Sequence, residues 1–294
     1  YLKEALAEFH HLSPEQIVVG NGTNEVIELI IRTCLRPDEN IIYVQSSFMV
    51  YKLCSLAMGR TIKEVPLKNL TYDLPAVADA IDEKTKLIFI ANPNNPTGTY
   101  VNKSELDTFL DTIPEDVLVV LDEAYLEYVT AADYPNGLDY LNKRKRIMVT
   151  RTFSKCYGLA GLRIGYGIGE PQLIDYINRG REPFNTNTLA QIGALAALDD
   201  TDHLNRSSRI NREEMDRISP QLESCGLVVT PSQANFVLVD FKKDAQQMFE
   251  KLLRLGVIVR PMAGYGLPTS ARITIGTPEQ NAKLLEVLPQ ALGL

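Results

Sequence analysis

Apolar, strand-like runs alternate with amphipathic helical segments through the first half of the chain, and this order leaves few folds open. Residues 87–90 (Leu-Ile-Phe-Ile) and 117–121 (Val-Leu-Val-Val-Leu) are apolar at every position, as parallel strands are when helices cover both faces of their sheet. The segment 103–112 between them has the amphipathic pattern of a helix. Strands joined through helices form right-handed parallel units. We therefore predict an α/β fold built on a mostly parallel sheet.

The pattern changes near residue 200, which predicts a second domain. Long helical segments come first, and a helix at 278–292 ends the chain. Between them, short strand-like runs are predicted at 228–229, 236–239, 257–259 and 272–275. We therefore predict a large α/β domain over residues 1–199 and a small α+β domain over residues 200–294.

Polar side chains follow the predicted strands of the large domain. Asn95 lies in a turn at 91–98 that is rich in proline and asparagine, and Asp122 and Tyr125 follow the strand at 117–121. Ligands of open α/β sheets bind at the carboxyl ends of the strands. We therefore expect these side chains to meet at one edge of the sheet and to form a site there.

A glycine-rich turn over residues 20–25 joins a short predicted strand to an amphipathic helix. Backbone N–H groups at the start of a helix bind phosphate, so Gly22, Thr23 and Asn24 are candidate phosphate ligands. An ordinary strand-to-helix turn explains the pattern equally well. A dinucleotide-binding fingerprint would need a third glycine where Glu25 stands, which argues against a nicotinamide-dependent oxidoreductase.

Lys155 stands in a polar turn after the apolar run 147–149. Thr152 and Ser154 precede it, and Arg163 follows among glycines and small apolar residues. In isolation such a lysine is usually a solvated surface residue. A lysine that bonds covalently to a phosphorylated planar cofactor needs this setting, because the hydroxyls and the arginine can bind the phosphate. We therefore interpret Lys155 as the lysine that binds pyridoxal phosphate.

The other polar residues of the predicted edge suit the ring of this cofactor. Asp122 can hold the pyridine nitrogen protonated through a charge-assisted hydrogen bond. Tyr125 and Asn95 can donate hydrogen bonds to the ring oxygen, and Phe48 can stack on the ring. Each has a simpler explanation, since Asp122 can cap a helix, Asn95 can stabilise a turn and Phe48 can belong to the core. The combination along one sheet favours the cofactor site.

Composition excludes several other classes. A net charge of −7 offers no basic excess for a nucleic-acid partner. No apolar run has the length of a membrane span. The four cysteines lack paired spacing, which predicts reduced thiols and a cytoplasmic protein, and the three histidines form no metal-binding set.

Three motifs resemble the fold-type I aminotransferases: Asn-Pro-Thr-Gly at 95–98, Asp-Glu-Ala-Tyr at 122–125, and Ser-Lys followed by Gly-Leu-Arg within 154–163. Among the fold-type I aminotransferases, the chain is most similar to the histidinol-phosphate aminotransferases of the class II subgroup. The stretches that support this resemblance are 20–25, 183–187, 260–268 and 272–277. The similarity covers nearly the whole chain.

The resemblance implies a role for each matching residue. Lys155 bonds to pyridoxal phosphate and then moves a proton between substrate and cofactor. Arg272 binds the α-carboxylate of glutamate or another anion in its place, and Arg260 helps to bind a substrate phosphate or a distal carboxylate. The resemblance also implies a homodimer that acts on a small amino donor and a 2-oxo acid. The resemblance further implies an N-terminal arm, which we expect to precede residue 1 of this sequence.

The expected reaction transfers the amino group of L-histidinol phosphate to 2-oxoglutarate. An aromatic or broad-range aminotransferase and an O-phosphothreonine decarboxylase are alternatives with the same cofactor. A protein that binds the cofactor without turnover is a further alternative, but Lys155, Asp122 and Tyr125 together argue against it, because binding alone does not require groups that stabilise electron transfer into the ring.

Overall fold

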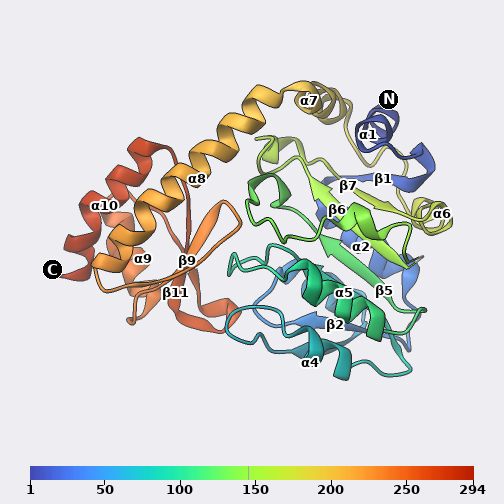
Figure 1. Ribbon diagram of the computed structural model, residues 1–294, viewed down its shortest axis with the longest axis horizontal. Helices are drawn as coiled ribbons and strands as arrows, with labels where there is room; N and C mark the ends of the chain where they lie inside the picture. Colours follow the sequence, from blue (N-terminus) through green and yellow to red (C-terminus); the bar gives the residue numbers. More distant parts are fainter. Residues whose placement is uncertain (145) are drawn as a thin grey trace.

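The computed structural model describes residues 1–144 and 146–294, and it contains two sheets (Figure 1). The spatial order of the large sheet is β1 (Ile17–Gly20), β7 (Gly165–Gly169), β6 (Ile147–Thr152), β5 (Leu118–Asp122), β4 (Thr85–Ala91), β2 (Asn40–Val44) and β3 (Thr61–Val65). From β6 to β3 all neighbours are parallel, whereas β7 is antiparallel to both β6 and β1. The predicted α/β fold with a mostly parallel sheet is confirmed.

Helices cover both faces of the large sheet. Helices α2 (Gly22–Cys34), α3 (Met49–Ala57) and α6 (Pro171–Arg179) pack on one face. On the other face, α4 (Leu74–Asp79) and α5 (Lys103–Thr112) share a core with the central strands, and α1 (Leu2–His10) and α7 (Thr188–Asp199) pack near β1 and β7. Short 3-10 turns link these elements: η1 (Pro14–Gln16), η2 (Leu126–Tyr128), η3 (Gly137–Tyr140) and η4 (Ala160–Leu162).

Strand β5 shows how the sheet distributes its side chains. Leu118 and Val120 belong to the core beneath α2 and α3, whereas Val119 and Leu121 belong to the core beneath α4 and α5. Successive strand residues point to opposite faces. Asp122 therefore ends the strand on the same face as α2 and α3, and it is 4% exposed.

The strand directions bring the predicted polar clusters to one edge. The parallel strands β2, β4, β5 and β6 all end there. Because β7 runs in the opposite direction, it starts at this edge, and β1, which is antiparallel to β7, ends at it. The turn before α2, the turn after β4 and the loop between β6 and β7 therefore face one another.

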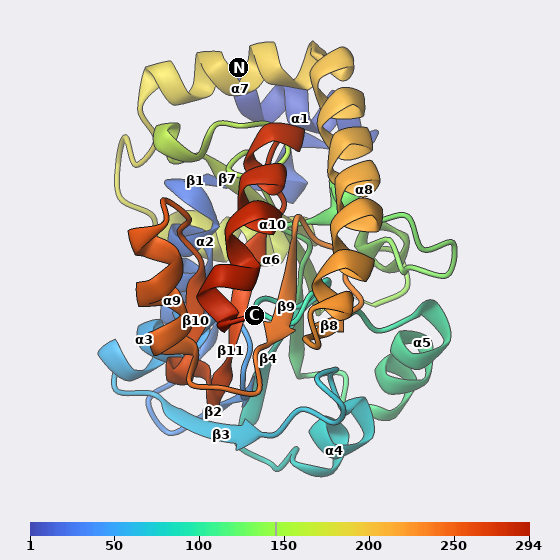
Figure 2. The same ribbon diagram turned by 90° about the vertical axis from the view of Figure 1, so that its left-hand side faces the viewer.

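The second sheet is antiparallel and has the order β10 (Arg260–Met262), β11 (Leu267–Thr274), β9 (Phe236–Asp240) and β8 (Val228–Thr230). The long helix α8 (Thr201–Ser224) runs from the large sheet to this one, and together with α9 (Ala245–Arg254) and α10 (Pro278–Leu292) it covers one face (Figures 1 and 2). The boundary predicted at residue 200 stays a prediction, although α8 begins next to it.

Side chains alternate on this sheet as well. Val237 and Ile273 join the core beneath α8, α9 and α10. Phe236 and Arg272 therefore point to the opposite face. Phe236 packs against Tyr125 of the large sheet, with ring centroids 5.2 Å apart.

One predicted strand is wrong. Residues 257–259 are outside any strand, and β10 starts only at Arg260. The segment instead ends helix α9: Gly256 has a φ of 84°, and the N–H of Val257 donates to the carbonyl of Leu252 at 2.9 Å. This left-handed termination satisfies the last carbonyls of the helix. Val257 belongs to this helix end, and Ile258 and Val259 connect it to β10.

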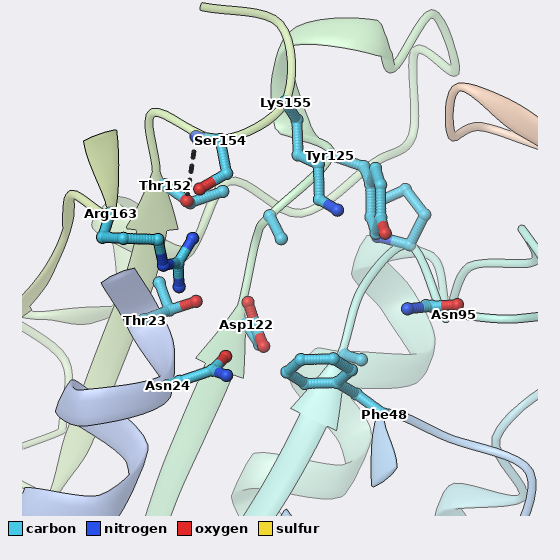
Figure 3. A pocket seen from close by; sticks show the side chains of 13 residues that line it. Thr23, Asn24, Phe48, Asn95, Asp122, Tyr125, Thr152, Ser154, Lys155 and Arg163 are labelled. Carbon is cyan, nitrogen blue, oxygen red and sulfur yellow. Dashed lines mark hydrogen bonds between the residues drawn. The ribbon is translucent and has the colours of Figure 1, made fainter. Parts of the chain in front are cut away.

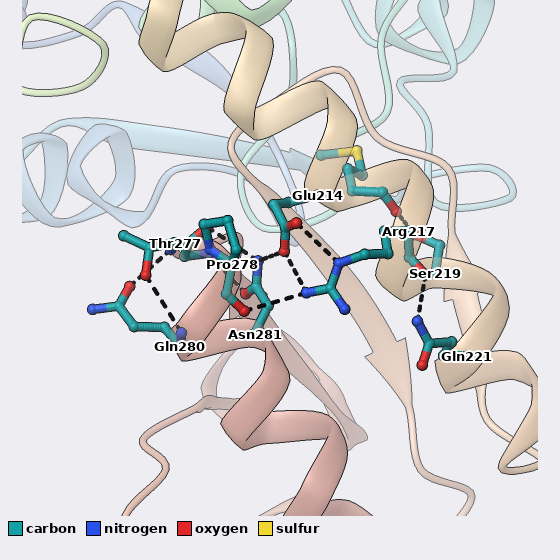
Figure 4. A network of polar contacts seen from close by, with 10 residues as sticks. Glu214, Arg217, Ser219, Gln221, Thr277, Pro278, Gln280 and Asn281 are labelled. Atoms are coloured by element: carbon teal, nitrogen blue, oxygen red, sulfur yellow. Dashed lines mark hydrogen bonds and ion pairs between the residues drawn. The ribbon is translucent and has the colours of Figure 1, made fainter.

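A buried polar network joins α8 to the start of α10 (Figure 4). Glu214 accepts hydrogen bonds from Arg217 and from Nδ2 of Asn281, the latter at 2.7 Å. Asn281 also exchanges two hydrogen bonds with the backbone of Gly276, each 3.0 Å long. Gly276 lies shortly after β11, so the network fixes the end of the strand that carries Arg272.

Candidate active site

One cavity collects the residues predicted at the edge of the sheet (Figure 3). Its lining includes Thr23, Asn24, Phe48, Asn95, Asp122, Tyr125, Thr152, Ser154, Lys155 and Arg163. They come from α2, from the last residues of β5 and β6, from the turns after β2, β4 and β5, and from the segment between β6 and β7. Segments far apart in the sequence thus meet as the strand directions require.

Lys155 is largely buried in the loop after β6. Its pKa is lowered from the ordinary lysine value, first by burial and then by the positive charge of Arg272. Nζ lies 5.2 Å from the centroid of the Tyr125 ring. A lowered pKa increases the neutral fraction of the amine, and the neutral amine is the form that attacks a carbonyl carbon.

Asp122 presents one free carboxylate oxygen to the cavity. Oδ2 accepts a hydrogen bond of 2.6 Å from the hydroxyl of Tyr51, whereas Oδ1 is buried and has no hydrogen-bond partner among the described residues. Burial raises the pKa of Asp122, and the hydrogen bond from Tyr51 opposes that rise. Burying a carboxylate oxygen without a hydrogen-bond donor costs folding free energy. We therefore expect an N–H group of a ligand to donate to Oδ1 of Asp122.

The start of α2 and Arg163 form an anion site on the other side of the cavity. Asn21 precedes the helix without a side-chain cap, which leaves N–H groups of the first turn available for an anion. Gly22 has a φ of 72°, and a Cβ there would collide with the Arg163 guanidinium. Thr152 and Ser154 add hydroxyls beside this position (Figure 3). One cation, two hydroxyls and a helix N-terminus suit a phosphate group.

Asn95 and Tyr125 lie where the oxygen of a bound ring can be recognised. Oδ1 of Asn95 accepts a hydrogen bond from Arg272, so its Nδ2 group is left to face the cavity (Figure 3). Burial raises the pKa of Tyr125, which therefore keeps its proton and remains a donor. Phe48 lines the same cavity with its ring. These placements fit the predicted contacts with a planar ring.

Arg272 and Arg260 are neighbours on the small sheet. They are paired across β10 and β11 in register. Arg272 reaches the large sheet at Asn95, and its guanidinium lies 5.0 Å above the Phe236 ring. Arg272 is not among the residues that line the cavity, and Arg260 is exposed and lies outside the lining as well. Its role in substrate binding stays a prediction.

A buried ion pair lies behind the site. Nη2 of Arg151 donates to Oε2 of Glu123 at 2.8 Å, and both side chains are buried. Since successive strand residues alternate, Glu123 and Arg151 point away from the face that Asp122 and Thr152 present. The pair joins the ends of β5 and β6 and holds the two site residues in register.

Tyr51 is a site residue to which the sequence analysis assigned no role. It follows Phe48 by three positions at the start of α3, and residues three apart share one face of a helix. The spacing from Phe48, a predicted cavity residue, therefore indicates that Tyr51 lies near the site. The contact with Asp122 is not predictable from spacing, because the two residues are distant in the sequence.

In the part of the chain that the structure describes, no cluster of three or more His, Cys, Asp or Glu side chains is arranged to hold a metal ion. No helix within residues 1–144 and 146–294 has both the length and the apolar character to cross a membrane.

The fold and the cavity are suited to an enzyme that binds a phosphorylated, nitrogen-containing ring. The chain belongs to the class I and II aminotransferases, because that family model matches residues 1–288. It is 47% identical to "Histidinol-phosphate aminotransferase 2" of Pseudomonas fluorescens Pf-5 over 99% of this chain and 79% of the relative. A similarly named relative from Nitrosococcus oceani is also 47% identical, with the same coverage.

A solved structure extends this similarity to the fold. The histidinol-phosphate aminotransferase of Sinorhizobium meliloti, crystallised with pyridoxal 5'-phosphate, is 28% identical and superposes with a TM-score of 0.91. The match covers 99% of this chain and 80% of that protein. Pyridoxal phosphate is accordingly the cofactor of this enzyme.

The residues of the cavity fit this cofactor. The free Oδ1 of Asp122 complements a protonated ring nitrogen, and the helix N-terminus with Arg163 complements the phosphate. Lys155, with its lowered pKa, lies above and to the right of Asp122 in the view of Figure 3, with Arg163 on the opposite side of Asp122. The donors on Asn95 and Tyr125 complement the ring oxygen.

Proposed function

We propose that this enzyme transfers the amino group of L-histidinol phosphate to 2-oxoglutarate and releases imidazole acetol phosphate and L-glutamate. When bound, pyridoxal phosphate supplies an electron sink for bonds at the reacting carbon of the substrate. Asp122 holds the ring nitrogen protonated, and Arg163, Thr152, Ser154 and the turn at 22–24 hold the phosphate. Lys155 binds the cofactor and moves a proton between substrate and cofactor.

The observation that carries the proposal is the position of Arg272. Its Nε is buried and has no hydrogen-bond partner in the described residues, and it forms no ion pair with a described carboxylate. Its charge nevertheless lies close enough to lower the pKa of Lys155. An arginine in this state binds an anion well. Both proposed substrates bring one, a phosphate on the donor and a carboxylate on the acceptor.

Arg260 is a second candidate for substrate binding. Its Cα is paired with that of Arg272, and its side chain is exposed beside the same sheet. Two adjacent cations would favour a substrate with a doubly charged phosphate over one with a single carboxylate. This argument supports a phosphorylated amino donor.

The test is a half-reaction. The enzyme, loaded with pyridoxal phosphate, receives L-histidinol phosphate without any oxo acid, and mass spectrometry measures the imidazole acetol phosphate formed. We expect about one equivalent per active site, followed by glutamate when 2-oxoglutarate is added. Oxo product from tyrosine, phenylalanine or aspartate alone would make the enzyme an aromatic or broad-range aminotransferase. Release of carbon dioxide from O-phosphothreonine would make it a decarboxylase.

We also infer that the enzyme is a cytoplasmic homodimer. Phe184 is 97% exposed, and Leu189 and Ile192 are 73% and 58% exposed on one face of α7. Contiguous exposed apolar side chains mark interaction surfaces. The free thiols of the four cysteines support a reducing compartment. Light scattering should give the mass of two chains, and Ile192→Glu should lower it; a monomeric wild-type enzyme would contradict the inference.

A further inference from the structure

Tyr51 connects two parts of the site without lining the cavity. Its hydroxyl donates to Oδ2 of Asp122 at 2.6 Å, and its ring stacks on Phe89 with a centroid distance of 4.4 Å and an interplanar angle of 2°. The edge of the Phe48 ring meets it at 5.5 Å. Tyr51 is 1% exposed. Packing on Phe89 therefore fixes the position from which the hydroxyl reaches Asp122.

The face of the sheet explains why these residues meet. Phe89 belongs to the core beneath α2 and α3, and Asp122 ends β5 on the same face. Tyr51 approaches this face from α3. A hydroxyl at this point satisfies Oδ2 and leaves Oδ1 without a partner among the described residues. The two oxygens of the carboxylate are thus distinguished by the protein itself.

The hydrogen bond also affects the charge of Asp122. Burial raises the pKa of this carboxyl group. The hydrogen bond from Tyr51 is the largest influence that lowers it again, ahead of the Thr150 hydroxyl, the Ala124 N–H and the charge of Lys155. The pKa of Tyr51 is raised well above the ordinary value, mainly by burial, so its hydroxyl keeps its proton and stays a donor. A donor to a carboxylate favours the charged form of that carboxylate.

We propose that Tyr51 is a positioning residue that orients Asp122, keeps it ionised, and directs Oδ1 toward the ring nitrogen of the cofactor. This inference rests on the proposed function, since it takes Asp122 as the partner of that nitrogen. The same side chain supports Phe48, so one buried tyrosine aligns the contact at the ring nitrogen and the contact at the ring face. A purely structural tyrosine would affect only stability.

The test compares wild-type enzyme with Tyr51→Phe, which keeps the stacked ring and removes the hydroxyl. Both proteins are loaded with pyridoxal phosphate labelled with ¹⁵N in the ring, and the ¹⁵N chemical shift is followed as the pH rises. We expect the ring nitrogen of the variant to lose its proton at lower pH than in the wild type. Loss of one hydrogen bond to a charged group should also weaken cofactor binding about tenfold.

Tyr140→Phe is the matched control. Its hydroxyl donates to Asp107 at 2.7 Å, but neither residue lines the site cavity. The control removes the same kind of bond and should leave the ¹⁵N titration unchanged. An equal change in both variants would overturn the inference, because it would reflect general loosening of the fold.

A double-mutant cycle isolates the route through Asp122. In an Asp122→Asn background the side chain at 122 carries no charge, so adding Tyr51→Phe should change the cofactor dissociation constant by less than about twofold. A full tenfold loss in that background would overturn the inference. If the wild-type protein gives no signal from bound cofactor, the proposed function itself fails. If it binds normally and Tyr51→Phe titrates like the wild type, the proposed function stands and the role of Tyr51 is refuted.

Discussion

Nη1 of Arg272 donates a hydrogen bond to Oδ1 of Asn95 at 2.5 Å. This contact joins β11 of the small sheet to the turn after β4 of the large one. The two ends of the Asn95 amide therefore have different surroundings: the oxygen accepts the hydrogen bond from Arg272, and the nitrogen faces the cavity (Figure 3). In the proposed site, this one side chain therefore contacts both the cofactor oxygen and the arginine that binds the substrate anion.

Asn95→Ala should weaken binding of the oxo acid as well as of the cofactor. Without its acceptor, Arg272 loses a charge-assisted hydrogen bond, and we expect KM for 2-oxoglutarate to rise about tenfold. Steady-state kinetics at saturating pyridoxal phosphate measure this effect. Asn102→Ala is a suitable control, because Asn102 caps α5 at the surface. An unchanged KM in Asn95→Ala would show that Arg272 is oriented by other contacts.

Lys155→Ala should abolish turnover and retain weak cofactor binding. The variant lacks both the nucleophile and the proton-transfer group, so kcat should fall by roughly 10³-fold or more. Borohydride treatment followed by mass spectrometry should attach the cofactor to Lys155 in the wild type and to no residue in the variant. Lys52→Ala, which removes a surface partner of Glu64, serves as the control. Full activity in Lys155→Ala would refute the assignment.

Much of the site could be predicted because each residue follows a recognisable strand. Asp122 comes directly after an apolar run, and Lys155 follows another. Parallel strands in an α/β sheet end at one edge, so local sequence was sufficient to bring these residues together. Arg163 lies at the same edge although β7 is antiparallel, because Arg163 precedes β7 and this strand starts where β6 ends.

The contacts that the sequence did not predict depend on packing between distant segments. Tyr51 and Asp122 are 71 positions apart, and Arg272 and Asn95 are 177 apart. Which hydroxyl reaches which carboxylate oxygen depends on helix position and side-chain rotamer rather than on periodicity. The false strand at 257–259 has a different cause, since a left-handed helix end and a short strand both accept valine and isoleucine.

The rate at which Lys155 bonds covalently to the cofactor should depend on pH, and replacing Arg272 should change this dependence. Burial, first of all, and then the positive charges of Arg272 and Arg163 lower the pKa of Lys155 below the ordinary lysine value. The neutral amine reacts, so the capture rate rises with pH and levels off above the lysine pKa. Arg272→Gln removes a neighbouring positive charge, which raises that pKa and should move the profile to higher pH.

Stopped-flow mixing of cofactor-free enzyme with pyridoxal phosphate across a range of pH gives this profile. Arg209→Gln is the control, since Arg209 pairs with Glu213 on the surface of α8. Its profile should coincide with that of the wild type. A shift of the Arg272→Gln profile to lower pH would have the wrong sign and would contradict the electrostatic argument.

Gly22→Ala should damage the phosphate site selectively. Gly22 has a φ of 72°, where a side chain is strained, and a Cβ there would displace the Arg163 guanidinium. The strain should cost about 1–2 kcal/mol of unfolding free energy. Displacement of Arg163 should weaken binding of pyridoxal phosphate but leave binding of pyridoxal, which has no phosphate, nearly unchanged. Gly59→Ala is the matched control, because Gly59 has a φ of 65° and no atom lies within 4 Å of a Cβ there. Equal losses for both ligands in Gly22→Ala would show that the glycine serves the fold rather than the phosphate.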